Sequence, residues 1–228
     1  MLKFLKSFEP RLLMLAAGVV GALWAFLSIA DEVMEGETLA VDRQLLLLLR
    51  SPGDPTDPIG SRKVEEAIRD VTALGGFTVL TLVTAVAVIA FLLHKRWRHA
   101  LVMLGAALVG ELCSDLLKSA YGRPRPDLVP HGSYVYSASF PSGHSLHAAV
   151  VFLTLAMLIS SLETHRSTKM LAYSLAILIL VAVGFSRVYL GVHWPTDVLG
   201  GWCLGAAVAL GAWMALIGLG GRPRKAVD

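Results

Sequence analysis

Long apolar stretches, each nearly free of charged residues, dominate the pattern of this chain. Most of them approach the roughly 20 residues that an α-helix needs to cross about 30 Å of hydrocarbon. We therefore predict an all-α, polytopic membrane protein with six transmembrane helices. The expected spans are residues 12–30, 74–93, 100–117, 144–161, 170–185 and 198–219.

The segment between the first two spans, about residues 31–73, has a different pattern. From Val41 to Arg50 a leucine run lies between charges, a Ser-Pro-Gly-Asp-Pro turn begins at Ser51, and residues 62–74 carry apolar side chains at helical spacing. These features predict interfacial helices lying on the outer membrane surface. A hairpin lid without lipid contact is the alternative. Either arrangement could cover the mouth of an active site.

The remaining connections are short and the chain has no useful internal repeat, so we expect a single helical-bundle domain over residues 1–228. Gly201, Gly205 and Ala209 recur every fourth residue in the last span, which indicates close helix packing. Cys113 and Cys203 are isolated in predicted helices and indicate neither a metal site nor a disulfide framework. A cleaved signal peptide is the alternative for the first span, but its apolar stretch exceeds the roughly 7–15 residues of a signal core.

Composition agrees with a membrane protein, because 55% of the residues are hydrophobic, 16% are charged and the mean hydropathy is +0.65. The formal charge of +3 and pI near 9.0 could indicate a nucleic-acid partner. The basic residues, however, are dispersed among loops and form no continuous stripe. We therefore expect no nucleic-acid binding.

Most Lys and Arg residues gather in alternate loops, as the positive-inside rule requires. Between Asp31 and Asp70, by contrast, Asp and Glu outnumber Lys and Arg about two to one. We therefore expect both termini in the cytoplasm and residues 31–73 on the outer side. The basic residues are Lys3, Lys6 and Arg11 before the first span, Lys95, Arg96 and Arg98 after the second, Arg166 and Lys169 after the fourth, and Arg222, Arg224 and Lys225 at the end.

Four basic residues depart from this rule, because Lys118, Arg123, Arg125 and Arg187 fall on the outer side. Positive charge in that place predicts an anionic partner. A phosphate group, with up to two negative charges and three acceptor oxygens, fits such a cluster. Surface salt bridging is the alternative, and Arg123 by itself can be an accessory.

Three segments between residues 118 and 197 carry basic residues and histidines at defined spacings. The first is Lys118, six residues, then Arg125-Pro126; the second is Pro141-Ser142-Gly143-His144; the third is Ser186-Arg187, five residues, His193, three residues, then Asp197. In order and spacing these segments resemble the three motifs of the type 2 phosphatidic acid phosphatase superfamily, whereas the flanking helices match only in being membrane spans.

The second and third segments suit phosphoryl transfer on physical grounds as well. Gly143 opens an apolar helical run and lets backbone N–H groups approach a phosphate, while Ser142 can cap that helix or bind a phosphate oxygen. Asp197 follows His193 by four residues and can hold one ring nitrogen, which leaves the other free as a nucleophile. Alternatively, Asp197 only caps the sixth helix.

The resemblance implies that His193 attacks phosphorus to form a phosphohistidine and that His144 protonates the leaving oxygen. It also implies that Lys118, Arg125 and Arg187, together with Ser142 and Gly143, hold the phosphate. No metal or other cofactor is expected, since protein cations take its place.

Three further polar residues lie near these motifs without belonging to the family pattern. His147 is expected to support the site or to be structural. Glu111 and Asp115 should share a face of the third helix with Lys118 and point into the bundle. Ion pairing is one interpretation of this face, and a proton path or headgroup contact is the other.

We therefore expect an enzyme that dephosphorylates lipid phosphates or diphosphates at the periplasmic face of the bacterial cytoplasmic (inner) membrane, without an obligatory protein partner. Undecaprenyl diphosphate, phosphatidylglycerol phosphate, phosphatidic acid, diacylglycerol diphosphate and lipid A phosphates would all fit. The outward-facing site and the family resemblance favour the first of these, although no residue separates them. A lipid phosphotransferase with the same site, and a non-catalytic protein that binds or transports anionic lipids, are the alternatives.

Overall fold

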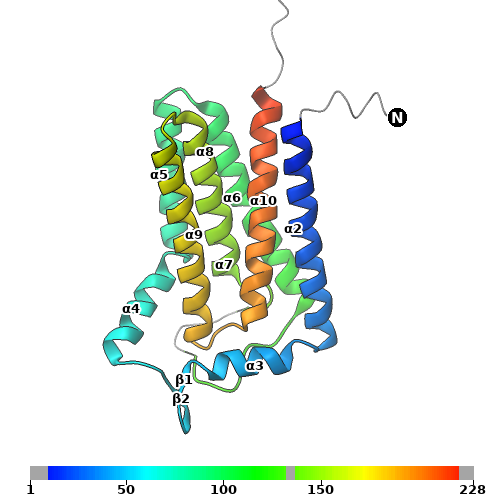
Figure 1. The fold of residues 1–228 in the computed structure, drawn as a ribbon, viewed down its shortest axis with the longest axis vertical. Coiled ribbons are helices and arrows are strands. Elements are labelled where there is room, and N and C mark those ends of the chain that lie inside the picture. The colour runs from blue at the N-terminus through cyan, green and yellow to red at the C-terminus, as the bar shows by residue number, and fades with distance from the viewer. Residues whose placement is uncertain (1–9, 132–136, 221–228) are drawn as a thin grey trace, which may run out of the picture.

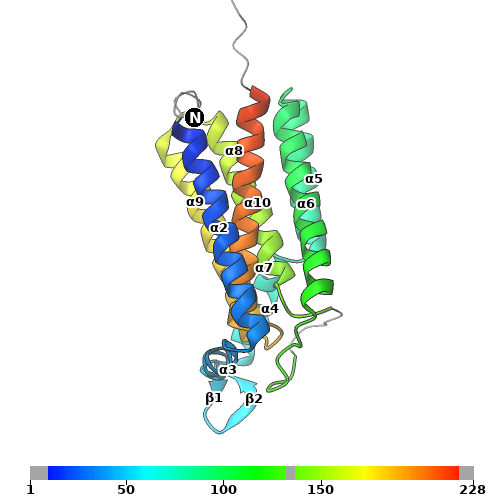
Figure 2. The same cartoon turned by 90° about the vertical axis from the view of Figure 1, so that its right-hand side faces the viewer.

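The structure, a computed structural model, describes residues 10–131 and 137–220 of the 228-residue chain. Long helices stand side by side in a bundle (Figure 1; Figure 2). Five of the described helices are long and apolar enough to cross a membrane, and α4 with α5 makes a sixth candidate that is bent by 45°. The predicted all-α membrane bundle is confirmed, with five to six spans.

The helix bounds extend most of the predicted spans. The first, third, fifth and sixth predicted spans are continuous helices that run two or more residues further at one end or at both. The elements, in order, are α2 (Pro10–Glu35), α3 (Leu39–Leu47), β1 (Arg50–Ser51), β2 (Asp54–Pro58), α4 (Arg62–Ala73), α5 (Phe77–Leu93), α6 (Trp97–Tyr121), α7 (Gly143–Ala148), the π-helix η1 (Ala149–Leu153), α8 (Thr154–Leu162), α9 (Arg166–Tyr189) and α10 (Pro195–Gly220).

Two predicted spans differ from the structure in their continuity. The second begins at Phe77 because Gly75 and Gly76 interrupt the helix, and a Cβ at Gly75 would lie 2.5 Å from Val183 and 3.1 Å from the His144 carbonyl oxygen. The fourth contains the π-helical turn η1, where one continuous helix was predicted. Apolar periodicity does not distinguish a single π-helical turn from α-helix.

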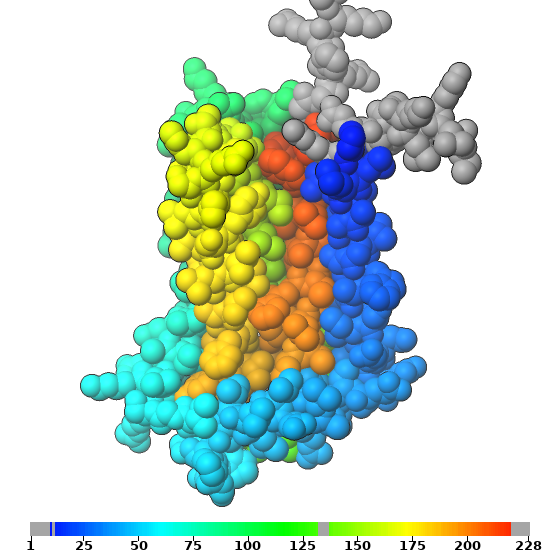
Figure 3. All heavy atoms as spheres, viewed as in Figure 1, coloured from blue at the N-terminus to red at the C-terminus, as the bar shows by residue number. Residues whose placement is uncertain are grey.

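The segment between α2 and α5 lies at the end of the bundle opposite to the start of α2 and the end of α10 (Figure 1). We call this the α3 end. Helices α3 and α4 confirm the predicted short helices, and the predicted turn joins β1 to β2 in an antiparallel pair that was not foreseen. Two prolines in the exposed five-residue strand β2 mask any strand pattern. In Figure 3, residues of α3 and this hairpin lie over the end of α9 and the start of α10.

The basic connections α5–α6 and α8–α9 lie at the opposite end from α3, together with the first turn of α2 (Figure 1). This arrangement matches the alternation predicted from the charge pattern. Lys3, Lys6, Arg222, Arg224 and Lys225 lie outside the described residues.

Helix α10 stands at the centre and contacts both α2 and α7. A Cβ on Gly205 would lie 2.5 Å from the Ala149 Cβ, and one on Gly201 would lie 2.8 Å from the Ser142 carbonyl oxygen. These small residues therefore allow close packing of the last span, as predicted, and its partner is the α7–η1 helix. Phe140, fully buried, stacks on Phe26 at 5.7 Å and meets Tyr121 edge-on at 5.2 Å, which fixes the chain just before α7.

Candidate active site

The three motif segments meet at the α3 end of the bundle. The first begins in the last turn of α6 and continues into the following loop, the second enters α7, and the third joins the end of α9 to the start of α10. The backbone N–H of Ser142 donates to the Asp197 carbonyl oxygen at 3.0 Å, so the second and third segments are directly connected. The structure thus brings together residues that are up to 79 positions apart in the sequence, from Lys118 to Asp197.

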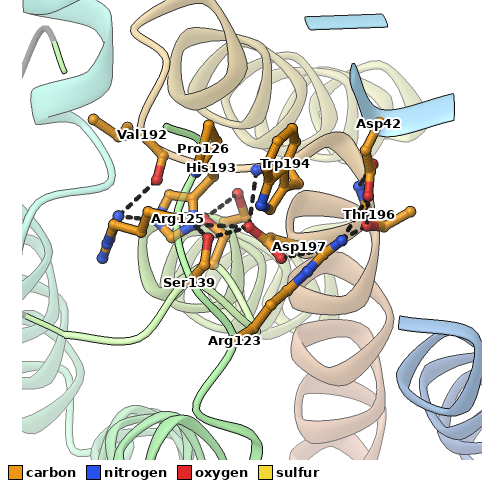
Figure 4. Close-up of polar contacts among 12 residues, drawn as sticks. Asp42, Arg123, Arg125, Pro126, Ser139, Val192, His193, Trp194, Thr196 and Asp197 are labelled. Atoms are coloured by element: carbon orange, nitrogen blue, oxygen red, sulfur yellow. Dashed lines mark hydrogen bonds and ion pairs between the residues drawn. The ribbon is translucent and has the colours of Figure 1, made fainter. Parts of the chain in front are cut away.

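His193 lies buried in the turn between α9 and α10, as Figure 4 shows. Its Nδ1 is 3.3 Å from Asp197 Oδ2 and its Nε2 is 3.3 Å from an Arg125 guanidinium nitrogen. Burial lowers the pKa of His193 to about 4, against the opposing effect of Asp197. The ring is therefore neutral near pH 7, and a proton on Nδ1 beside the carboxylate leaves the Nε2 lone pair directed toward Arg125.

Asp197 makes both of the contacts that the sequence left open. Its Oδ2 faces His193 and also accepts hydrogen bonds from Ser139 Oγ at 2.5 Å and from the Trp194 backbone N–H at 2.8 Å. Because α10 begins at Pro195, the Trp194 contact is the backward bond of a capping box. One carboxylate therefore both caps α10 and holds the His193 ring.

Lys118 and Arg125 converge on the same space from the first segment. A Cβ on Gly143 would lie only 2.9 Å from Lys118 Nζ, so glycine leaves room for the ammonium group at the start of α7. Arg125 donates to the carbonyl oxygens of Val192 at 2.7 Å and Ser137 at 2.8 Å, and burial lowers its pKa. Arg125 therefore lies beside the His193 ring and Lys118 beside the N-terminus of α7.

Arg187, in the last turn of α9, is only 2% exposed. One guanidinium nitrogen donates to Thr72 Oγ1 of α4 at 3.0 Å. Among the described residues its Nε has no hydrogen-bond partner. A buried donor without a partner is unfavourable, and a phosphate oxygen is a suitable acceptor for it.

The second segment contributes His144 in the first turn of α7. Four charged or titratable side chains interact electrostatically with its ring: Arg187, His193, His147 and Lys118. The side chain of Ser142 forms no cap on α7, contrary to one of its two expected roles, and its Oγ accepts a hydrogen bond from Ser145 Oγ at 3.0 Å.

Arg123, which the sequence left open as an accessory of the basic cluster, is paired within the protein. Its guanidinium pairs with Asp42 Oδ2 at 2.7 Å and with Asp197 Oδ1 at 2.5 Å. Asp42, on α3, and Ser139 are site residues that sequence reasoning missed. Asp42 lies 81 positions before Arg123, and no spacing pattern connects the two.

Glu111 and Asp115 are both exposed in the isolated chain, so neither is buried inside the bundle, although Glu111 does face a neighbouring helix. Glu111, 48% exposed, faces His147 of the neighbouring helix with 3.2 Å between Oε2 and Nε2. The two side chains are close enough for an ion pair when His147 is protonated, but they do not form a hydrogen bond. The expected pairing with a neighbouring helix is therefore found for Glu111.

Glu111 and His147 also line an apolar cavity of about 340 Å³ between α5, α6 and the α7–η1 helix. Aliphatic and aromatic side chains make most of its wall, including Phe77, Leu80, Leu104, Leu108 and Val151. A space of this kind suits a hydrocarbon chain more than a soluble phosphate ester.

Positive charge in the site comes from Lys118, Arg125 and Arg187. Within residues 10–131 and 137–220, no three His, Cys, Asp or Glu side chains come together in a way that could hold a metal ion. The carboxylate of Asp197 is engaged by Arg123, Ser139 and the Trp194 backbone.

Comparison with known proteins places this geometry in a family. Residues 98–217 match the model of the PAP2 superfamily. Phosphatidylglycerophosphatase B of Bacillus subtilis is 40% identical over 146 residues, which are 62% of this chain and 70% of that protein. Undecaprenyl-diphosphatase of Sulfolobus acidocaldarius is 41% identical over 124 residues, which are 52% of this chain and 56% of that protein.

A solved structure agrees with these matches. The crystal structure of a transmembrane PAP2 type phosphatidylglycerolphosphate phosphatase from Bacillus subtilis superposes with a TM-score of 0.74 at 32% identity and covers 86% of this chain and 94% of that one. The family match alone spans more than half of the 228 residues. The chain therefore belongs to the PAP2 superfamily, the type 2 phosphatidic acid phosphatases that its three motifs resemble.

Proposed function

We propose that this protein removes phosphate from lipid phosphates or diphosphates with His193 as the nucleophile and without a metal. The observation that carries the proposal is the buried His193 ring, with Asp197 at one nitrogen and Arg125 at the other. Phosphatases among the relatives support the reaction class, and the cluster of three cations supports a phosphate as the group that is bound.

In the first step, His193 Nε2 attacks phosphorus while the bond from phosphorus to the lipid oxygen breaks. Protonated His144 donates its proton to that oxygen, because an alkoxide is a poor leaving group. Lys118, Arg125 and Arg187 stabilise the charge that spreads over the equatorial oxygens. Asp197 stabilises the positive charge that the His193 ring acquires.

The first step leaves His144 neutral. In the second step, water attacks the phosphohistidine and gives a proton to His144. The phosphorus–nitrogen bond breaks, inorganic phosphate leaves, and both histidines return to their starting protonation states. If an acceptor lipid took the place of water, the same site would act as a phosphotransferase.

The apolar cavity between α5, α6 and the α7–η1 helix supports a lipid as the substrate, because a hydrocarbon chain can lie in it beside His147, which follows His144 by three residues. The Bacillus subtilis protein of the solved structure, which covers 86% of this chain and 94% of that one, is by its name a phosphatidylglycerolphosphate phosphatase. We therefore place phosphatidylglycerol phosphate first among the substrates to test, ahead of undecaprenyl diphosphate, which the sequence favoured.

We also propose that the α3 end faces the periplasm and that both termini face the cytoplasm. The charge pattern supports this orientation, since the basic loops gather at the end opposite to α3. Each protomer carries a complete set of the motif residues, so catalysis requires no protein partner.

The direct test is an assay of the purified protein in EDTA against phosphatidylglycerol phosphate, phosphatidic acid and undecaprenyl diphosphate. Release of inorganic phosphate that is abolished in a folded His193→Ala variant supports the proposal. Phosphorylated acceptor lipid in place of free phosphate would support the phosphotransferase. Lipid binding without turnover in the native protein would contradict an enzyme.

A further inference from the structure

We propose that Asp42 and Arg123 are positioning residues for the reaction, acting on His193 through Asp197. This inference rests on the proposed function of His193 and Asp197. It gives helix α3, which lies outside the three motifs, a part in the chemistry. Figure 4 shows the row of side chains from Asp42 through Arg123 to Asp197 and His193.

Arg123 holds the two carboxylates at different ends of its guanidinium group. One terminal nitrogen donates to Asp197 Oδ1 at 2.5 Å and to Thr196 Oγ1 at 2.8 Å. The other donates to Asp42 Oδ2 at 2.7 Å and to Thr38 Oγ1 at 3.3 Å. The planar fork of arginine suits this double contact, which an ammonium group could not reproduce.

The row is buried, which separates it from an ordinary surface salt bridge. Asp42 and Asp197 are both 0% exposed and Arg123 is 8% exposed. Its guanidinium also lies over the Trp194 ring, 5.7 Å from the centroid. Buried charges are stable only when they are paired and fully hydrogen-bonded, so loss of either end would leave the other charge uncompensated.

Asp42 also contacts the first turn of α10. Its Oδ1 accepts a hydrogen bond from the Thr196 backbone N–H at 3.0 Å, and its Oδ2 accepts one from Thr196 Oγ1 at 2.7 Å. The carboxylate therefore satisfies a free N–H group at the N-terminus of α10, where negative charge is favourable. Thr196 directly precedes Asp197, so Asp42 fixes the turn that carries the His193 partner.

Charge balance gives the row an effect on the reaction beyond this anchoring. Arg123 alone would neutralise Asp197 and weaken its support for the positive ring that forms when His193 takes up phosphorus. Asp42 compensates Arg123, so the three groups together keep one net negative charge beside His193. The low dielectric constant of a buried site makes that balance effective over several ångströms.

A purely structural role for the row makes a different prediction from charge balance. The Asp42→Asn change would leave the three groups neutral, and Arg123→Gln would leave two negative charges without a cation between them. The double variant would restore one net negative charge while removing the ion pairs. If the row acts only as an anchor, the kcat of the double variant should be no higher than that of the less active single variant.

The test uses full-length protein in detergent with EDTA and dioctanoyl phosphatidic acid as the probe. The variants are Asp42→Asn, Arg123→Gln and the double change, with Asp70→Asn, an exposed aspartate of α4, as the matched control. We expect Asp42→Asn to lower kcat about tenfold with KM within about twofold. Loss of a residue that only holds a functional side chain in position typically has an effect of this size. The double variant should recover kcat to within a few-fold of the native value.

The proposal is wrong if Asp42→Asn retains the kcat of Asp70→Asn, or if the double variant is no more active than the weaker single variant. Where Asp42→Asn does not fold, the comparison of Arg123→Gln with the double variant decides by the same criterion. Loss of folding in all three, with Asp70→Asn folded, would assign the row to structure alone and overturn the proposal. A His193→Ala variant that kept its activity would instead overturn the proposed function.

Discussion

At the scale of single residues, the candidate site depends on how burial and partners set the state of each side chain. The motif residues could be selected from the sequence because Lys118, Arg125, Ser142, His144, Arg187, His193 and Asp197 occur at a recognisable spacing. The partners that hold them could not. Asp42 and Ser139 reach Asp197 or Arg123 only after distant segments fold together, and their own neighbours in sequence carry no signal of it.

The protonation state of His193 provides a prediction at this scale. Burial lowers its pKa to about 4, below the usual 6.5, so the ring should stay neutral as the pH falls from 7 to 5 and should gain a proton only near pH 4. Nitrogen NMR of histidine-labelled protein without substrate measures this titration. The His193 signals are assigned by their absence in His193→Gln, and a midpoint near 6.5 would contradict the buried, neutral ring.

At the scale of elements, most of the spans follow from their apolar stretches, whereas the breaks depend on tertiary contacts. Gly75 separates α4 from α5 where the backbone passes close to His144. The π-helical turn η1 and the β1–β2 hairpin have no apolar period that identifies them. Close packing of the last span was predicted from its small residues, but its partner was not. The structure shows that α10 packs on α7, and this contact carries the second motif against the third.

Gly205 tests that contact. Its Cβ would lie 2.5 Å from Ala149 and 2.7 Å from the Leu146 carbonyl oxygen, so Gly205→Ala should force α10 away from α7 and cost about 1–3 kcal/mol by overpacking. The matched control is Gly211→Ala, also in α10, where no neighbouring atom lies within 4 Å of the new Cβ. Thermal unfolding in detergent should show a lower midpoint for Gly205→Ala alone. Equal midpoints would show that the close approach is unimportant.

At the scale of the whole molecule, the bundle combines a polar site at the α3 end with an apolar cavity between its helices. Hydropathy and alternate basic loops predicted the membrane bundle and the end at which the motifs gather. The cavity between α5 and α6 could not be predicted, because it depends on how far two spans separate in space. Helical spacing predicted that Glu111 points into the bundle. In the structure Glu111 lines this cavity, a position that only the spatial arrangement of the helices reveals.

Filling the cavity should discriminate between substrates by chain length. Ala107 lines the cavity, so Ala107→Trp should raise KM about tenfold for a long-chain phosphatidic acid and leave the KM for a dibutanoyl form nearly unchanged. Leu112→Trp is the control, because Leu112 is an exposed apolar residue of the same helix. If Ala107→Trp changed the KM of both substrates equally, the cavity would not be a binding site for the lipid chain.

The central claim is that phosphate passes through His193. The most direct measurement mixes the purified protein with phosphorus-32-labelled lipid phosphate in excess EDTA, quenches the reaction in alkali and maps the labelled peptide. We predict an alkali-stable, acid-labile label on the peptide that contains His193, and no label in His193→Ala. Steady release of phosphate without a labelled protein, label on another residue, or a requirement for added Mg²⁺ would contradict the account.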